Sequence, residues 1–187
     1  MCIVCIIINL LFGVAMLRIA HSMSQLRFSE LMTVYHEGNL ENGVDRYPYL
    51  TVNEQLRYAE QDFYNYLSSV FFLQRASLYA IWEIDGAYKS ALRLEPYSDG
   101  MLLCALETAP EARGKGYATE RISAIQRYLR KQGSGKVYSH VSKRNAASLA
   151  VHKKCGFQII KDSAVYSDGS VMHNSYTLTY RYEKSEI

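Results

Sequence analysis

Two glycines and two cationic side chains lie within the segment ARGKGYATE, residues 112–120, which leads into a run with helical character. The first amides of a helix have no partner within the helix, and the helix dipole adds partial positive charge at the same end. Glycines let the backbone approach a ligand closely, so the segment predicts a site for a negatively charged group. Because Arg113 and Lys115 can converge on the same anion as these amides, a pyrophosphate fits better than a single carboxylate.

This segment matches neither of two common phosphate-binding patterns. It lacks the GxxxxGK[ST] of a Walker A loop and the GxGxxG of a dinucleotide-binding unit. The composition of the chain also argues against a polyanion such as duplex DNA, because 21 Lys and Arg against 18 Asp and Glu give a net charge of only +3. We therefore expect a local site for one small anion and no nucleic-acid partner.

The elements that must position this turn follow from the pattern of apolar residues, which predicts one mixed α/β domain. Helices are expected over 24–36, over about 53–70 with Asn53 as N-cap, from about 117 to 133, and over 145–154 with Asn145 as N-cap. Residues 37–54, rich in Gly, Asn and Pro, interrupt the helical pattern. Strands are expected over 16–22, 77–85, 87–96, 101–110, 136–142, 157–163 and 170–183, with turns at Asp85-Gly86 and Asp168-Gly169. The result is a mixed, mostly antiparallel sheet of about seven strands with four helices.

The N-terminal run MCIVCIIINLLFGVAML contains no charged side chain. A spanning helix needs about 20 apolar residues and a signal peptide needs a cationic start, and the run meets neither condition well. We therefore interpret residues 1–15 as an upstream extension without a structural role, with translation starting at Met16. A membrane anchor and a signal peptide are the alternatives.

The four cysteines of the chain are Cys2, Cys5, Cys104 and Cys155. Cys2 and Cys5 form a CxxC, but no second CxxC or His pair accompanies it, so we expect no metal site. The spacing also gives no disulfide framework, and a reducing cytoplasm fits this usage.

Two motifs carry a resemblance to a known family. Arg113, Gly116 and Ala118 match the R/Q-x-x-G-x-G/A motif of the GNAT superfamily of acyl-CoA-dependent N-acyltransferases. The segment NAASLAVHKKCGF resembles a second signature of that family, an Asn-led helix that ends in Lys-x-Gly-Phe. Both lie in the family's order, and the expected elements are similar to the GNAT fold over residues 16–187.

The resemblance implies where acetyl-CoA would bind. The strand expected over 101–110 would splay from the next strand, and the pantetheine arm would lie in the gap against the backbone of Leu106, Glu107 and Thr108. Asn145 would contact this arm or act as a plain N-cap, and the two roles are compatible. The pyrophosphate would be held by Arg113, Gly114, Lys115, Gly116, Tyr117 and Ala118.

The implied reaction is direct attack of a neutral amine on the thioester, which needs a base for the amine and an acid for the thiolate. Glu107 is the candidate base because it is the only acidic residue in 101–110, and an exposed or salt-bridged glutamate is the alternative. The family often has a Tyr acid seven residues after the helix-opening Asn, where this chain has His152. His152 is the candidate acid, and a solvent-facing histidine without a role is the alternative. Tyr138 and His140 are expected to line the same cleft.

These features imply a cytoplasmic N-acetyltransferase that uses acetyl-CoA, without a metal, on a primary amine of a small molecule or peptide. A non-catalytic acyl-CoA-binding module is the alternative, since the usual Tyr acid is missing. Several tyrosines fall in the region that covers the acceptor site in similar proteins. An aromatic acceptor pocket is one hypothesis for them, and an amphipathic surface or a homodimer contact is the favoured alternative. They are Tyr47, Tyr49, Tyr58, Tyr64 and Tyr66.

Overall fold

A computed structural model describes residues 4–10, 13–166 and 169–182 of the chain, with side chains from residue 15 onward. The helices of more than one turn are α1 (Phe28–Val34), α2 (His36–Arg46), α3 (Val52–Ser69), α4 (Tyr117–Lys131) and α5 (Ala146–Lys154). The strands are β1 (Val4–Leu10), β2 (Gly13–Ala20), β3 (Leu78–Ile84), β4 (Ala87–Tyr97), β5 (Gly100–Thr108), β6 (Lys136–Ser142), β7 (Gln158–Lys161), β8 (Ala164–Val165), β9 (Val171–Met172) and β10 (Ser175–Arg181).

Eight of these strands form one sheet in the order β1-β2-β3-β4-β5-β6-β10-β7, and β8 pairs with β9 beside it. Every neighbouring pair in the large sheet is antiparallel except β5 and β6. The predicted class, a mixed and mostly antiparallel sheet flanked by helices, is confirmed. Among the described residues the seven expected strands are present, with the last divided into β9 and β10. Strands β1 and β8 are additional, and five helices replace the expected four.

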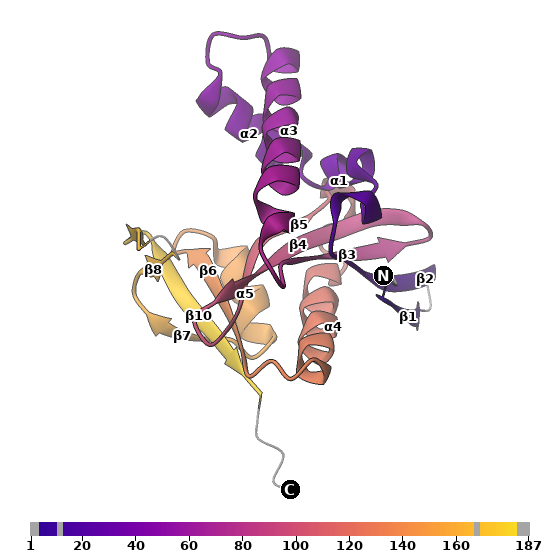
Figure 1. Cartoon of the computed structure of the whole chain (residues 1–187), viewed down its shortest axis with the longest axis vertical. Coiled ribbons are helices and arrows are strands. Elements are labelled where there is room, and N and C mark those ends of the chain that lie inside the picture. Colours follow the sequence, from indigo (N-terminus) through magenta and orange to yellow (C-terminus); the bar gives the residue numbers. More distant parts are fainter. Residues whose placement is uncertain (1–3, 11–12, 167–168, 183–187) are drawn as a thin grey trace, which may run out of the picture.

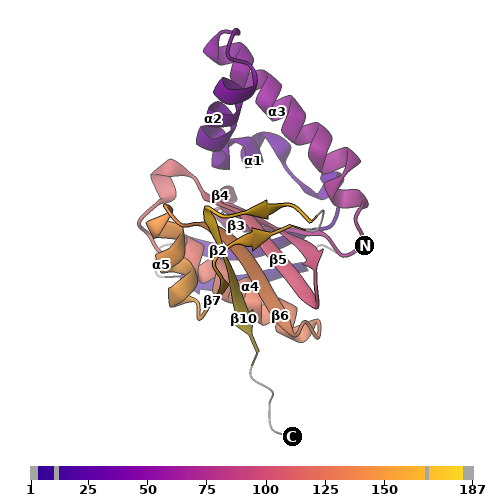
Figure 2. The same ribbon diagram turned by 90° about the vertical axis from the view of Figure 1, so that its left-hand side faces the viewer.

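The helices form two layers on opposite faces of the sheet (Figures 1 and 2). Helices α1, α2 and α3 lie on one face, with α2 and α3 standing away from the sheet as a pair, and α4 and α5 lie on the other. Strand β3 is buried along its whole length because its side chains alternate between the two layers. Ala80 and Trp82 pack toward α4, whereas Tyr79 and Ile81 pack toward α1 and α3.

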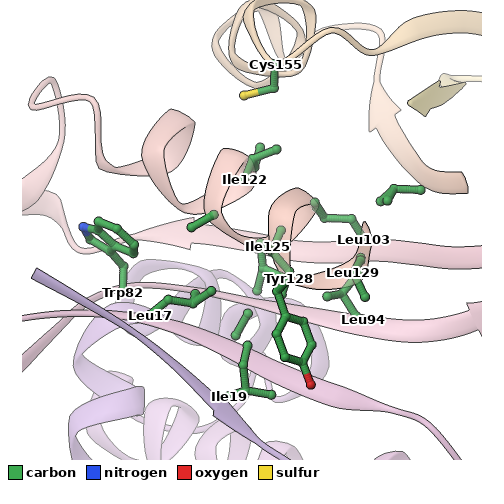
Figure 3. Packing of buried hydrophobic residues seen from close by; sticks show 14 of the residues in the cluster. Leu17, Ile19, Trp82, Leu94, Leu103, Ile122, Ile125, Tyr128, Leu129 and Cys155 are labelled. Carbon is green, nitrogen blue, oxygen red and sulfur yellow. The ribbon is translucent and has the colours of Figure 1, made fainter. Parts of the chain in front are cut away.

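The larger core lies between the sheet and α4 (Figure 3). Ile122, Ile125 and Leu129 recur on one face of α4, as the helical spacing predicts, and each is at most 3% exposed. Figure 3 shows these side chains against Leu94 and Leu103 of the central strands. This packing fixes the start of α4, and with it the turn at 113–118, relative to β5.

The N-terminal segment differs from its interpretation as an extension without a structural role. Strand β2 begins at Gly13, ahead of Met16, and β1 pairs with it along its whole length from Val4 to Leu10. The pairing gives the described part of 1–15 a structural role. The start of translation and the treatment of 16–187 as one domain stay predictions, and Cys2 and Asp168 lie outside the described residues. No helix in the described part of the chain is long and apolar enough to cross a membrane.

Helix α2 is where the sequence-based expectation is wrong. Residues 37–54 were expected to interrupt the helical pattern because Gly38 and Gly43 disfavour helix, yet α2 spans most of this stretch. The N-cap of α3 is Thr51, and Asn53 lies inside the helix. The carboxylate of Glu54 accepts the amide of Thr51 at 3.0 Å and its hydroxyl at 2.7 Å, an arrangement that stabilises the start of α3.

Gly43 permits close packing of α2 against α3. A Cβ at this position would lie 2.6 Å from the carbonyl oxygen of Gln55, whereas a Cβ at Gly38 in the same helix would meet nothing within 4 Å. We expect Gly43→Ala to destabilise the protein by about 1–3 kcal/mol because the helices must move apart. Gly38→Ala should stabilise it by about 0.5–1 kcal/mol. Urea denaturation of both variants checks this, and equal effects would contradict the close approach.

Candidate active site

Strands β5 and β6 diverge in the middle of the sheet. Their parallel ladder covers Met101–Val137, Leu102–Tyr138 and Leu103–Ser139 and extends no further among the described residues. A polar cavity of about 140 Å³, the gap cavity, lies between the diverging ends. It is lined by Leu103, Cys104, Ala105, Leu106, Ser139, His140, Val141, Ser142, Asn145, Ser148 and His152. The splay that the sequence analysis expected is therefore present.

A β-bulge deforms β5 at the same place. The register with β4 shifts between Ala91 and Arg93, so that Glu107 lies opposite Ala91 and Cys104 lies opposite Arg93. Ala105 adopts a φ of +50°, a left-handed conformation that costs a non-glycine residue about 1–2 kcal/mol. The hydroxyl of Tyr35 on the α1 side donates to the carbonyl of Ala105 at 2.6 Å and holds the bulge.

The turn at 113–118 and the end of β5 line a second cavity of about 500 Å³, the turn cavity. It gathers the predicted cofactor-binding residues except Lys115, whose side chain is exposed outside it. It is lined by Leu106, Glu107, Thr108, Ala112, Arg113, Gly114, Gly116, Tyr117, Ala118, Thr119, Asn145, Ala147, Ser148 and Val151. The structure thus brings residues from three separate segments to one cavity.

The turn needs its glycines for conformation. Gly114 has a φ of +74°, and Gly116, the N-cap of α4, has a φ of +82°. Such values cost glycine little, so the backbone can present the first amides of α4 to the cavity. Arg113 donates through Nε to the carbonyl of Thr108 at 3.1 Å and through Nη2 to Glu37 of α2 at 2.6 Å. Arg113 therefore joins the turn to both β5 and α2.

Asn145 acts as an N-cap. Its Oδ1 accepts the amide of Ser148 at 2.9 Å, which satisfies one of the free donors at the start of α5. Asn145 also lines both the turn cavity and the gap cavity. Capping is confirmed, and its position leaves the second expected role open to test.

Glu107 borders two cavities. One is the turn cavity, and the other is a cavity of about 550 Å³, the helix cavity, on the face covered by α1, α2 and α3. It is lined by Tyr35, Gly38, Asn39, Asn42, Arg46, Ala59, Asp62, Phe63, Tyr66, Arg93, Ala105 and Glu107. Burial raises the pKa of the Glu107 carboxyl above its ordinary range, although Arg113 and Arg121 oppose the shift. A carboxylate with a raised pKa between two cavities suits proton abstraction.

A buried cation of α4 contacts the backbone of Glu107. Arg121 of α4 is fully buried, and its Nη1 donates to the carbonyl of Glu107 at 3.0 Å. Its Nε and Nη2 have no hydrogen-bond partner within the described residues, and burial lowers the pKa of the guanidinium to about 10. Arg121 was missed from the sequence because an Arg in an amphipathic helix ordinarily marks its solvent face.

His152 is buried, which contradicts the alternative of a solvent-facing histidine. Only 1% of the residue is exposed, because its ring packs edge-on against Phe157. Its Nδ1 lies 2.8 Å from the carbonyl of Ser148, so Nδ1 carries the proton in this bond. Burial lowers the pKa of the imidazole, which favours the neutral ring. Nε2 then has no proton to donate, and it has no hydrogen-bond partner in the described part of the chain.

The two other residues expected to line the cleft, Tyr138 and His140, do not line the same cavity. His140 lines the gap cavity, and neither of its ring nitrogens has a hydrogen-bond partner among the residues described. Tyr138 instead donates its hydroxyl to Asp99 at 2.5 Å, at the opposite end of β6. Of the five tyrosines expected near the acceptor, Tyr66 lines the helix cavity and Tyr49 is 98% exposed. The described residues contain no cluster of three or more side chains suited to a metal ion.

Comparison with known proteins agrees with this geometry. The model of the family described as "Acetyltransferase (GNAT) family" matches residues 39–157. No curated protein sequence matches the chain significantly.

Similar solved structures are acetyltransferases of low sequence identity. The PaiA N-acetyltransferase from Thermoplasma acidophilum, solved with coenzyme A, is 14% identical with a TM-score of 0.60 over 89% of this chain and 99% of its own. The ribosomal-protein-S18-alanine N-acetyltransferase from Escherichia coli is 16% identical with a TM-score of 0.56 over 91% of this chain and 98% of its own. The spermidine N-acetyltransferase from Vibrio cholerae, solved with CoA and spermine, is 16% identical with a TM-score of 0.55 over 89% and 95% of the two chains. At these identities the likeness shows the fold.

Proposed function

Because this chain belongs to the acetyltransferase (GNAT) family, we propose that it is an N-acetyltransferase that moves the acetyl group of acetyl-CoA to a primary amine by direct attack. The observation that carries the proposal is the position of Glu107, which borders the turn cavity on one side and the helix cavity on the other. A base at this junction can meet an amine from one cavity and a thioester from the other.

The turn cavity has the chemistry that acetyl-CoA requires. We propose that the amides at the start of α4 and the side chain of Arg113 hold the pyrophosphate, with Lys115 approaching from outside. Beyond Leu103, the edge of β5 that faces β6 would bind the amide groups of the pantetheine arm, since no described strand pairs with this edge there. Asn145 lies where it can contact the same arm.

Glu107 is the proposed base. Its raised pKa keeps the carboxylate basic enough to accept the proton that the amine loses on attack. The leaving group is a thiolate, which is stable at a pH not far above neutral and depends less on an acid than an alkoxide would.

The geometry of His152 favours a role as hydrogen-bond acceptor, through Nε2, over the role of general acid. We expect His152→Asn, whose amide can still donate to Ser148, to change kcat by less than about threefold, whereas loss of a true acid would cost about 10²–10⁴-fold. Steady-state kinetics check this, with thermal unfolding of the variant to confirm that it folds. A drop of a hundredfold or more in a folded variant would restore the acid role.

A binding measurement and a turnover assay together test the proposed function. Calorimetry with acetyl-CoA should give saturable binding, and release of the CoA thiol should depend on an added amine. Acetyl-CoA binding without turnover across a panel of amino acids, polyamines, aminoglycosides and peptides would instead favour the non-catalytic binding module. The cytoplasmic location and a homodimer stay predictions, which cell fractionation and light scattering test.

A further inference from the structure

We propose that the acceptor is a free amino acid, whose amine reaches Glu107 and whose carboxylate pairs with Arg93 in the helix cavity. This inference rests on the proposed acetyltransferase function and names its substrate class. The observations behind it are the position of Arg93, its remaining hydrogen-bonding capacity and the charge balance of the cavity.

The helix cavity has the size for such a ligand. Its volume is about 550 Å³, more than a single amino acid fills, and Glu107 forms the end that borders the turn cavity. Tyr35, Phe63 and Tyr66 give it apolar walls. An amine that approaches the thioester from this side must therefore pass through a cavity that also contains the guanidinium of Arg93.

Aromatic rings fix Arg93 in place. Its guanidinium carbon lies 4.7 Å from the ring centre of Tyr66 and 5.6 Å from that of Phe71, and its side chain is 17% exposed. Stacking of this kind orients the planar group before a ligand arrives. A fixed guanidinium loses little conformational freedom when it binds a carboxylate.

Arg93 has hydrogen-bonding capacity that the described residues do not use. Its Nε has no hydrogen-bond partner among the described residues, and Glu95, the one carboxylate that forms an ion pair with it there, is 3.9 Å away. That oxygen of Glu95 already accepts the hydroxyl of Tyr66 at 3.2 Å and contacts the thiol of Cys104 at 3.4 Å. A carboxylate is the ligand group that matches a guanidinium with free donors.

The spacing across β4 and β5 suits an amino acid. Glu107 of β5 lies opposite Ala91 of β4, and Arg93 is two residues beyond Ala91, so Glu107 and Arg93 are diagonal neighbours about 7–8 Å apart at the backbone. Side chains of this length can bring a carboxylate and a guanidinium to opposite ends of a group only a few bonds long. An α-amine and an α-carboxylate are joined through a single carbon.

The charge balance of the helix cavity disfavours a polyamine. Asp62 is already paired with Arg46 at 3.2 Å and accepts the hydroxyl of Tyr47 at 2.7 Å. Among the charged residues that line the cavity, Glu107 and Arg93 then remain to meet a ligand. A second ammonium group would face Arg93, whereas a carboxylate would be attracted to it.

The test compares acceptors that differ only in the carboxylate. Thiol release is measured with phenylalanine, leucine, serine, glutamine and lysine, each against its own primary amide. The amide keeps the shape but removes the negative charge. Its less basic amine is neutral in a larger fraction of molecules near pH 7, which would favour the amide if the carboxylate played no part. We expect kcat/KM for at least one acid to exceed that of its amide by about tenfold to a hundredfold.

Variants then assign the preference to Arg93. In Arg93→Met the ratio of acid to amide should fall to about one or below, and Arg93→Lys should recover part of it because an ammonium lacks the planar fork. Arg57→Met, on the exposed side of α3 and outside the helix cavity, is the matched control and should keep the wild-type ratio. Thermal unfolding confirms that each variant folds.

Each result of these assays supports or overturns the proposed acceptor. Faster turnover of the amides would overturn the amino-acid acceptor, favour a peptide N-terminus, and leave the acetyltransferase function standing. A preference for the acids that survives in folded Arg93→Met would overturn the role of Arg93. Acetyl-CoA binding with no turnover of either member of any pair, nor of the wider amine panel, would remove the proposed function and this inference with it.

Discussion

Replacement of Glu107 with glutamine is expected to lower kcat/KM for the acceptor by about 10²–10⁴-fold, the usual effect of losing a general base. Glutamine keeps the size of the side chain, and the backbone carbonyl that binds Arg121 is unchanged. Calorimetry should therefore show acetyl-CoA affinity within about threefold of the wild type. Thiol-release kinetics over a range of acceptor concentrations, at saturating acetyl-CoA, measure the loss.

The pH dependence gives this variant a second signature. Burial raises the pKa of Glu107, Glu37 and Glu41 add to the shift, and Arg113 and Arg121 oppose it. Only the ionised carboxylate accepts a proton, so the wild-type rate should fall as the pH drops through a value above the ordinary glutamate range near 4.3. Glu107→Gln should lack this acid limb. A variant that keeps both the limb and a rate within threefold of the wild type would show that Glu107 is not the base.

The same pKa shift predicts the direction of the stability change. A carboxyl whose pKa is higher in the folded state than in the unfolded chain binds its proton more tightly when folded. Its contribution is therefore most favourable below the unfolded pKa and is lost as the pH rises through the folded pKa. At neutral pH the ionised Glu107 costs stability, and Glu107→Gln should melt no lower than the wild type while losing activity.

The parts of the site that sequence could predict are those encoded locally. The turn at 113–118, the start of α4 and the cap at Asn145 depend on glycine conformations and on side chains within a few residues of one another. The splay of β5 from β6 was available only through the family resemblance, because nothing in either strand alone indicates where their ladder ends.

The remaining parts depend on contacts between distant segments. Helix α2 exists despite its glycines because Gly43 fits against Gln55 of α3, a contact that local propensity does not contain. His152 precedes Lys153 and Lys154, whose charges suggested an exposed helix face, but α5 packs its ring against Phe157. Arg93 is one of three charged residues in β4, and only the tertiary fold places Tyr66 and Phe71 against it.

Gly116→Ala is expected to weaken acetyl-CoA binding by at least about tenfold. Gly116 has a φ of +82° and lines the turn cavity, and an added Cβ would meet no protein atom within 4 Å. The methyl group would therefore project from the backbone where the ligand must approach the first amides of α4. The left-handed conformation would also cost alanine about 1–2 kcal/mol of stability. Calorimetry with CoA and acetyl-CoA measures the affinity, and thermal unfolding measures the stability.

Gly133→Ala, at the other end of α4, is the control that separates the loss of affinity from the loss of stability. Gly133 has a φ of +78°, its added Cβ would also meet nothing within 4 Å, and it lies outside the turn cavity. Both variants should lose similar stability because the backbone strain is the same, but only Gly116→Ala should lose affinity. Equal loss of affinity would mean that strain in α4 acts at a distance. If Gly116→Ala kept wild-type affinity, the backbone at this turn would not approach the pyrophosphate closely, and the proposed binding mode would fail.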